Sequence, residues 1–122
     1  MSAFSYPLVI LLLSLTILVP EAFAGLREVV VSHTDEKGVL QLYRMKEDGS
    51  DSMQLTFSKH GCRMPSISPD GEKLAYVEQV NHSLAIRISD CDGRNVRTLT
   101  EGGMNLIPSW FPDSEQLVWM KV

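Results

Sequence analysis

The sequence lacks the short motifs that mark the common catalytic sites. It contains no Gly-x-Ser-x-Gly nucleophile elbow, no phosphate-binding loop and no His-Glu-x-x-His metal motif. Its three histidines, His33, His60 and His82, are isolated from one another and each lies near an expected loop. His60 and Cys62 have the wrong spacing for a zinc site, which would also need two further ligands. The sequence therefore predicts a chain that is not an enzyme and that uses no cofactor or metal.

A basic cluster is also missing. The 122 residues include 11 Lys and Arg against 15 Asp and Glu, and the basic residues are scattered along the chain. A nucleic-acid-binding protein usually carries a basic patch or stripe. The formal net charge of −4 therefore argues against nucleic acid as a partner.

Helical periodicity is absent beyond residue 24. Short apolar or alternating stretches lie between turns rich in Gly, Asp, Asn and Pro, which is the pattern of an all-β sandwich, barrel or propeller. The expected strands are 29–31, 39–45, 53–57, 64–68, 73–77, 84–89, 96–99, 106–110 and 116–120.

The N-terminal segment has the features of a secretory signal. Residues 8–19 are apolar and uncharged, but they are too few for a membrane-spanning helix, which needs about 20 residues. Pro20 ends the run, and Ala22-Phe23-Ala24 has the small-x-small pattern of a cleavage site. We therefore expect a signal helix in 1–24, cleavage after Ala24 and a periplasmic or secreted mature chain. Residues 1–7 lack Lys and Arg, which leaves an uncleaved membrane anchor as the alternative.

One segment of the chain occurs twice. Residues 65–76 read PSISPDGEKLAY and residues 108–119 read PSWFPDSEQLVW, 43 positions apart. Upstream, Asp48-Gly49 recurs as Asp92-Gly93, and 54–56 recurs as 98–100, each 44 positions apart. A repeat of this length with four strands favours a β-propeller, whose blades have about 40–45 residues. Within a blade we expect 64–68 innermost, then 73–77, 84–89 and 96–99 at the edge. Turns 68–71 and 92–93 would then share one rim, and 78–83 and 100–105 the other.

This blade order separates the two cysteines. Cys62 would lie at one end of the inner strand, and Cys91 on the opposite rim. A five-residue strand spans roughly 17 Å, whereas a disulfide requires Cα atoms within about 7 Å. A disulfide within the chain is therefore disfavoured, and free thiols or an intermolecular pair remain.

Residues 68–76, the strand 84–89, Asp92-Gly93 and Thr98-Leu99-Thr100 together resemble the TolB-type β-propeller repeat. The resemblance covers nearly all of 25–122. In the second copy Phe111 replaces Ser68 and Ser114 replaces Gly71, so one turn departs from the pattern. We interpret the repeated Pro, Asp and Gly residues as structural residues of the turns: Pro69, Asp70, Gly71, Asp48, Gly49, Asp92, Gly93, Pro112 and Asp113. The apolar faces between blades would comprise Ile67, Leu74, Tyr76, Trp110, Leu117 and Trp119.

The resemblance implies a non-catalytic scaffold that docks protein partners in the periplasm, as TolB does in the Tol–Pal system. The alternative is a fragment of the propeller of a prolyl-oligopeptidase-type serine peptidase, which requires a catalytic domain beyond Val122. Closed propellers have about 4–8 blades, and this chain supplies about two four-stranded antiparallel blades plus extra strands. Three explanations stay open: a fragment of a longer propeller, several copies that complete one ring, or an open stack that folds alone.

Overall fold

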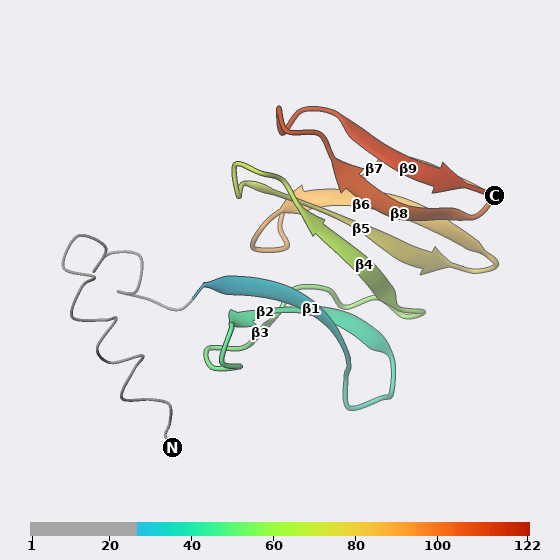
Figure 1. Cartoon of the computed structure of the whole chain (residues 1–122). Helices are drawn as coiled ribbons and strands as arrows, with labels where there is room; N and C mark the ends of the chain where they lie inside the picture. The colour runs from blue at the N-terminus through green and yellow to red at the C-terminus, as the bar shows by residue number, and fades with distance from the viewer. Residues whose placement is uncertain (1–26) are drawn as a thin grey trace, which may run out of the picture.

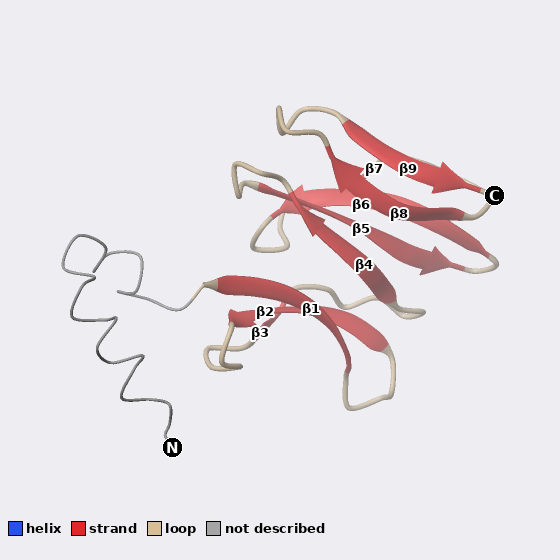
Figure 2. Ribbon diagram, in the orientation of Figure 1, coloured by secondary structure: helices blue, strands red, loops and turns tan. Residues whose placement is uncertain are grey.

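The computed structural model describes residues 27–122, in which every regular element is a β-strand (Figure 2). Nine strands form three antiparallel sheets that follow one another along the chain (Figure 1). In this part of the chain no helix is long and apolar enough to cross a membrane. The expected signal helix in 1–24 and the cleavage site after Ala24 lie outside the described residues.

The three sheets have three, four and two strands. The first has the order β1-β2-β3, with β1 (Glu28–Thr34), β2 (Leu40–Lys46) and β3 (Met53–Gln54). The second has the order β4-β5-β6-β7, with β4 (Cys62–Ile67), β5 (Lys73–Val80), β6 (Ser83–Asp90) and β7 (Arg97–Thr98). The third pairs β8 (Asn105–Trp110) with β9 (Leu117–Lys121). The second sheet confirms the predicted blade order, and the open set of sheets is that of an incomplete propeller.

The repeat shows which part of a blade each sheet holds. Leu42 of β2 and Ile86 of β6 are 44 positions apart, and they pair with β1 and β5 respectively. β1, β2 and β3 therefore correspond to the second, third and fourth strands of the complete sheet. β8 and β9 correspond to its first two strands, because they repeat the segments of β4 and β5 at an offset of 43.

The outer strands are shorter than the predicted 53–57 and 96–99 because threonine side chains replace part of the ladder. The Leu55 N–H donates to the Leu42 carbonyl at 2.8 Å, and the Leu42 N–H donates to Thr56 Oγ1 at 2.9 Å. The second sheet repeats both bonds with Ile86, Leu99 and Thr100. The Leu-Thr ending thus satisfies backbone groups after the regular strand stops.

The inner strands share a bulge. The register of β4 shifts between Arg63 and Ser66, and that of β8 shifts between Leu106 and Ser109. Met64 and Ile107, which precede the two repeated prolines, both have φ 54. A non-glycine residue with positive φ is uncommon, so its recurrence before both prolines marks the bulge as a regular feature of the inner strand.

Two apolar clusters hold the sheets together. Between the first and second sheets lie Leu42, Leu55, Cys62, Leu74 and Tyr76. Between the second and third sheets lie Val77, Leu84 and Ile86, with Leu99, Leu106, Leu117 and Trp119 packed against them. Full burial of one such aliphatic side chain contributes about 1.5–3 kcal/mol. The inter-blade packing predicted for Leu74, Tyr76, Leu117 and Trp119 is confirmed.

The prediction was wrong for Ile67, whose side chain is exposed, with 39% of its surface accessible. Ile67 pairs with Leu74 at the end of β4, and it lines a surface pocket together with Val29 of β1 and Cys91. β1 corresponds to a second strand, and no described strand lies inside it to cover Ile67. Trp110 is half-buried, and its indole Nε1 donates to the Ser66 carbonyl at 2.9 Å.

Candidate functional site

The turn between β4 and β5 is closed by one serine and one aspartate. The Ser68 N–H donates to the Lys73 carbonyl and the Lys73 N–H donates to Ser68 Oγ, each at 2.9 Å. Ser68 Oγ donates to Asp70 Oδ1 at 2.6 Å, and this bond is the main reason that the pKa of Asp70 is lowered. Gly71 has φ 79, and Pro69 is exposed at the corner of the turn. The Ser68 and Asp70 side chains thus satisfy hydrogen-bonding groups within the turn.

The turn between β8 and β9 is closed in a similar way, although Phe111 replaces the serine that is equivalent to Ser68. Asp113 Oδ1 accepts the Glu115 N–H at 2.9 Å and the Gln116 N–H at 3.0 Å, beside the exposed Pro112. Ser114 takes φ 61 in place of the glycine of the first copy. Its Oγ accepts the Asp70 N–H at 3.0 Å. The departure from the repeat pattern thus forms a hydrogen bond between the turns of neighbouring sheets.

The two Asp-Gly turns have the same local geometry in different surroundings. Gly49 has φ 88 and Gly93 has φ 86. Asp48 Oδ1 accepts the Ser50 N–H at 2.9 Å, and Asp92 Oδ1 accepts the Arg94 N–H at 3.1 Å. Side-chain hydrogen bonds from Ser50 and Arg94 are the largest causes of the lowered pKa values of these aspartates. A Cβ on Gly93 would lie 2.6 Å from the Leu55 carbonyl oxygen, whereas a Cβ on Gly49 would meet nothing within 4 Å.

Three of the four predicted turns are linked on one rim. The Cys91 N–H donates to the Glu72 carbonyl at 3.1 Å, which joins the turns at 68–71 and 92–93. The bond between Ser114 and Asp70 adds the turn at 112–114. We call this edge the first rim. Among residues 27–122, no group of three or more His, Cys, Asp or Glu side chains is placed to hold a metal ion.

Both cysteines are free thiols. Cys62 is buried in the first apolar cluster, and burial raises the pKa of its thiol to about 11. Cys91 is partly buried against the same cluster, and burial likewise raises the pKa of its thiol. The thiolate is the reactive form of cysteine, so neither environment favours a nucleophile.

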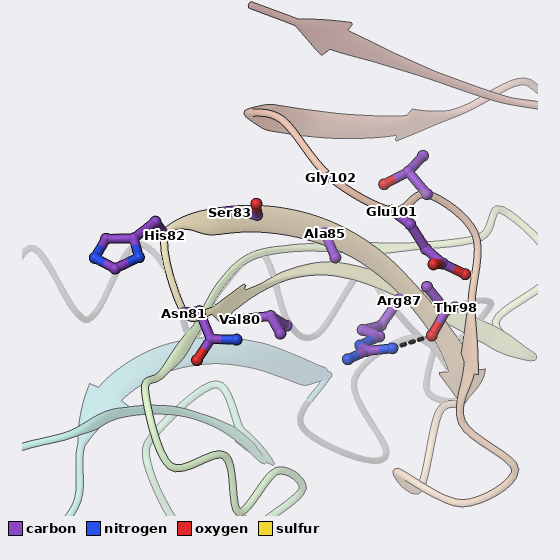
Figure 3. A pocket seen from close by; sticks show the side chains of 10 residues that line it. Val80, Asn81, His82, Ser83, Ala85, Arg87, Thr98, Glu101 and Gly102 are labelled. Atoms are coloured by element: carbon purple, nitrogen blue, oxygen red, sulfur yellow. Dashed lines mark hydrogen bonds between the residues drawn. The ribbon is translucent and has the colours of Figure 1, made fainter.

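The opposite edge, which we call the second rim, is hollowed. A pocket of about 440 Å³ lies where the β5–β6 turn faces the segment that follows β7 (Figure 3). Its walls include Asn81 and His82 from the turn, Arg87 from β6, and Thr98 and Glu101. These side chains offer hydrogen-bond donors, acceptors and both signs of charge. Such a lining suits the recognition of a polar chain segment.

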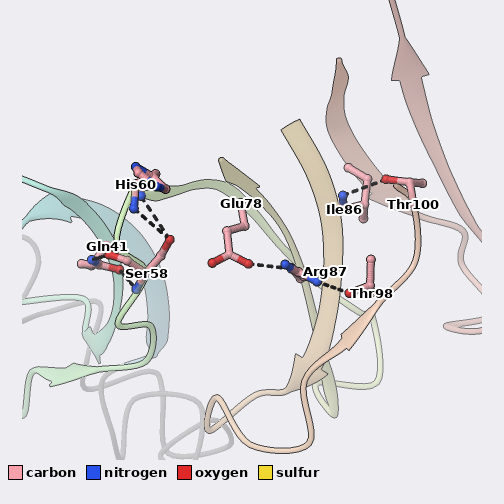
Figure 4. Close-up of polar contacts among 9 residues, drawn as sticks. Gln41, Ser58, His60, Glu78, Ile86, Arg87, Thr98 and Thr100 are labelled. Atoms are coloured by element: carbon pink, nitrogen blue, oxygen red, sulfur yellow. Dashed lines mark hydrogen bonds and ion pairs between the residues drawn. The ribbon is translucent and has the colours of Figure 1, made fainter. Parts of the chain in front are cut away.

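Arg87 holds the pocket wall in place. Its Nε donates to Glu78 Oε2 at 2.6 Å, and Nη1 donates to Thr98 Oγ1, so one side chain connects β5, β6 and β7 (Figure 4). About a fifth of each charged side chain is exposed. In the first sheet Tyr43 occupies the equivalent position, and its Oη donates to Gln54 Oε1 at 3.2 Å. The 44-residue offset aligns Tyr43 with Arg87 and Gln54 with Thr98. This offset is the sequence signal for the contact between Arg87 and Thr98, and an interpretation based on the turns alone misses it.

Buried amides at the sheet junctions are also missed by sequence reasoning. The Gln41 side chain donates to the Ser58 carbonyl at 2.7 Å and accepts the Thr56 hydroxyl at 2.9 Å. Asn105 donates to the Leu84 carbonyl at 2.8 Å and accepts Trp119 Nε1 at 3.2 Å. Both amides are almost fully buried. They bond backbone carbonyls at the sheet junctions, and these bonds satisfy the polar groups of the buried amides themselves.

Comparison with known proteins agrees with this architecture. The family model of the TolB beta propeller domain matches residues 19–122. The chain is 26% identical over 86 residues to a protein TolB homolog of Chlorobium luteolum, covering 70% of this chain and 20% of that protein. It is 33% identical over 61 residues to the Tol-Pal system protein TolB of Myxococcus xanthus, covering 50% and 14%. A solved structure from Agrobacterium tumefaciens, described as a TolB candidate, superposes with a TM-score of 0.67 at 20% identity, covering 75% and 33%.

The chain therefore spans one third or less of the length of each of these proteins. The structural likeness supports the fold, and the family match extends over most of the chain. The sequence repeat, the four-stranded second sheet and these matches lead to one conclusion. The chain belongs to the TolB β-propeller domain family.

Proposed function

We propose that this chain is an exported, non-catalytic propeller scaffold that binds protein partners in the periplasm or cell envelope. The observation that carries the proposal is the contrast between the two rims. Hydrogen bonds fix the turns of the first rim, whereas the second rim presents a polar pocket lined by Arg87, Glu101 and the β5–β6 turn. A rigid frame with an open polar surface is suited to recognition.

The relatives of the chain also support a scaffold in the cell envelope. One carries a name that places it in the Tol-Pal system, and the residues of 8–24 have the pattern of an export signal. The family match favours this scaffold over the propeller of a serine peptidase. Because the chain covers only part of its relatives, further blades from a longer chain or from additional copies would complete the ring.

The proposal is tested by location and by binding. The full sequence would be expressed in a Gram-negative host, and its periplasmic fraction examined by mass spectrometry of the intact chain. We expect a periplasmic product that begins at Gly25, and saturable binding to a purified Pal protein in calorimetry. Cytoplasmic retention would refute the export. An exported, folded chain that binds no Pal would refute the Tol–Pal partner.

A further inference from the structure

One arginine of the inner strand β4 has unused hydrogen-bonding capacity. Arg63 Nη2 donates to Gln79 Oε1 at 3.2 Å, and the buried Nε has no hydrogen-bond partner. No carboxylate oxygen of residues 27–122 lies within 4.0 Å of this guanidinium, although four other arginines of this region form ion pairs. A guanidinium stays charged and carries five N–H donors in a planar fork. Arg63 is therefore a partly buried cation without a described counter-ion.

Arg63 lines a cavity of about 260 Å³ on the second rim, between the second sheet and Met104, the residue before β8. Gln79, Asn81, His82 and Ser83 also line this cavity, and no acidic residue does so. Glu78, the acidic neighbour of Gln79, is engaged on the other face of the sheet by Arg87. The cavity thus combines the Arg63 guanidinium with polar side chains and with the apolar Leu84 and Met104.

We propose that this cavity binds a peptide carboxylate, with Arg63 as its ion-pair partner. The planar guanidinium matches the two oxygens of a carboxylate through parallel hydrogen bonds. Sites that enclose a whole small molecule hold about 300–1,000 Å³, so the smaller volume suits one acidic side chain or a chain terminus.

The position of the cavity favours a peptide over a free acid. It shares Asn81, His82 and Ser83 with the 440 Å³ pocket of the second rim. Figure 3 shows that Asn81 and His82 lie on the β5–β6 turn at the edge of the larger pocket. A peptide whose carboxylate contacts Arg63 therefore has an adjoining polar surface for its next residues. This inference holds whether or not the partner is a Tol–Pal protein.

The test is a nuclear magnetic resonance titration of the full chain with three tetrapeptides. Ac-Ala-Ala-Glu-Ala-NH2 carries a side-chain carboxylate, Ac-Ala-Ala-Gln-Ala-OH carries a terminal one, and Ac-Ala-Ala-Gln-Ala-NH2 carries none. We expect at least one acidic peptide to shift the Arg63 Nε–H signal and the Asn81 and His82 amides. Comparing the first two peptides identifies the source of the carboxylate. Arg63→Gln should weaken this binding by about tenfold or more.

Two further variants keep the test decisive. Arg97→Gln removes one positive charge from exposed β7, away from the cavity, and should leave binding unchanged. Gln79→Glu places a carboxylate beside Arg63 inside the protein, so it should abolish peptide binding even if Arg63→Gln fails to fold. Three outcomes would overturn the proposal: equal shifts with the neutral peptide, no shift with either acidic peptide, or unchanged affinity in folded Gln79→Glu. Equally strong binding of inorganic phosphate would overturn the assignment to a carboxylate.

Discussion

Alanine in place of Gly93 should destabilise the protein far more than alanine in place of Gly49. Both glycines occupy the same position of an Asp-Gly turn, with φ 86 and φ 88. A residue with a Cβ loses about 1–2 kcal/mol in this left-handed region, so that cost is common to both variants. Only at Gly93 would the new Cβ lie 2.6 Å from a backbone oxygen, that of Leu55 in the first sheet.

The contact at Gly93 cannot be relieved by a side-chain rotation, because its partner is a main-chain carbonyl. Relief requires a shift of the two sheets against each other, and overpacking of this kind costs about 1–3 kcal/mol. We therefore expect Gly49→Ala to lower the free energy of unfolding by about 1–2 kcal/mol, and Gly93→Ala to lower it by about 2–5 kcal/mol. Gly49→Ala is the matched control, because it changes the turn but not the sheet contact.

Urea unfolding followed by tryptophan fluorescence and circular dichroism measures both values. A change in midpoint at constant slope reports a change in stability. Equal losses in the two variants would show that the first and second sheets do not approach as closely as the structure places them. A larger loss for Gly49→Ala would contradict the reasoning altogether.

Three other predictions concern the first rim and the core. Ser114→Gly removes the positive-φ strain of a non-glycine residue but also the inter-sheet bond to Asp70, so stability should change by less than about 1 kcal/mol. Ser114→Ala keeps the strain and loses the bond, and a urea midpoint above that of Ser114→Gly would contradict this explanation. The pKa of Asp70 is lowered in the folded chain. Its carboxylate therefore adds to the free energy of unfolding above the ordinary aspartate pKa, and this contribution is lost as the pH falls through the pKa of the folded state. Urea midpoints should therefore drop below about pH 4, and less steeply in Asp70→Asn; an equal pH dependence would refute the role of Asp70. Buried Cys62, with its pKa raised to about 11, should react with iodoacetamide only on unfolding, whereas rapid labelling in the folded chain at pH 8 would contradict its burial.

Local chemistry made much of the fold predictable. The 43–44-residue repeat and the strand–turn alternation indicated blades, and the second sheet has the predicted strand order. Sequence reasoning placed the ends of the outer strands too late, because the Thr56 and Thr100 hydroxyls take over bonds that a backbone carbonyl would make. It also assigned Ile67 to a core that the described strands do not close.

The candidate site was less accessible to sequence reasoning. Arg87, Glu78 and Thr98 come from three strands, and their contact depends on sheet register rather than on a motif. Arg63 is distinguished by the lack of a nearby carboxylate among the described residues 27–122. Such properties depend on neighbours that are distant in the sequence.

The sequence by itself determined the repeat unit of this protein, since turn residues and strand periodicity act over a few positions. The Asp-Gly and Ser-Pro-Asp-Gly segments specify their backbone without help from the rest of the chain. Only the tertiary structure decided which of these equivalent turns also make contacts with a neighbouring sheet. Gly93 must be glycine because another sheet approaches it, and Ser114 can replace glycine because the neighbouring turn offers a hydrogen bond. The physical reason is that packing between sheets distinguishes positions that local conformational preferences treat as the same.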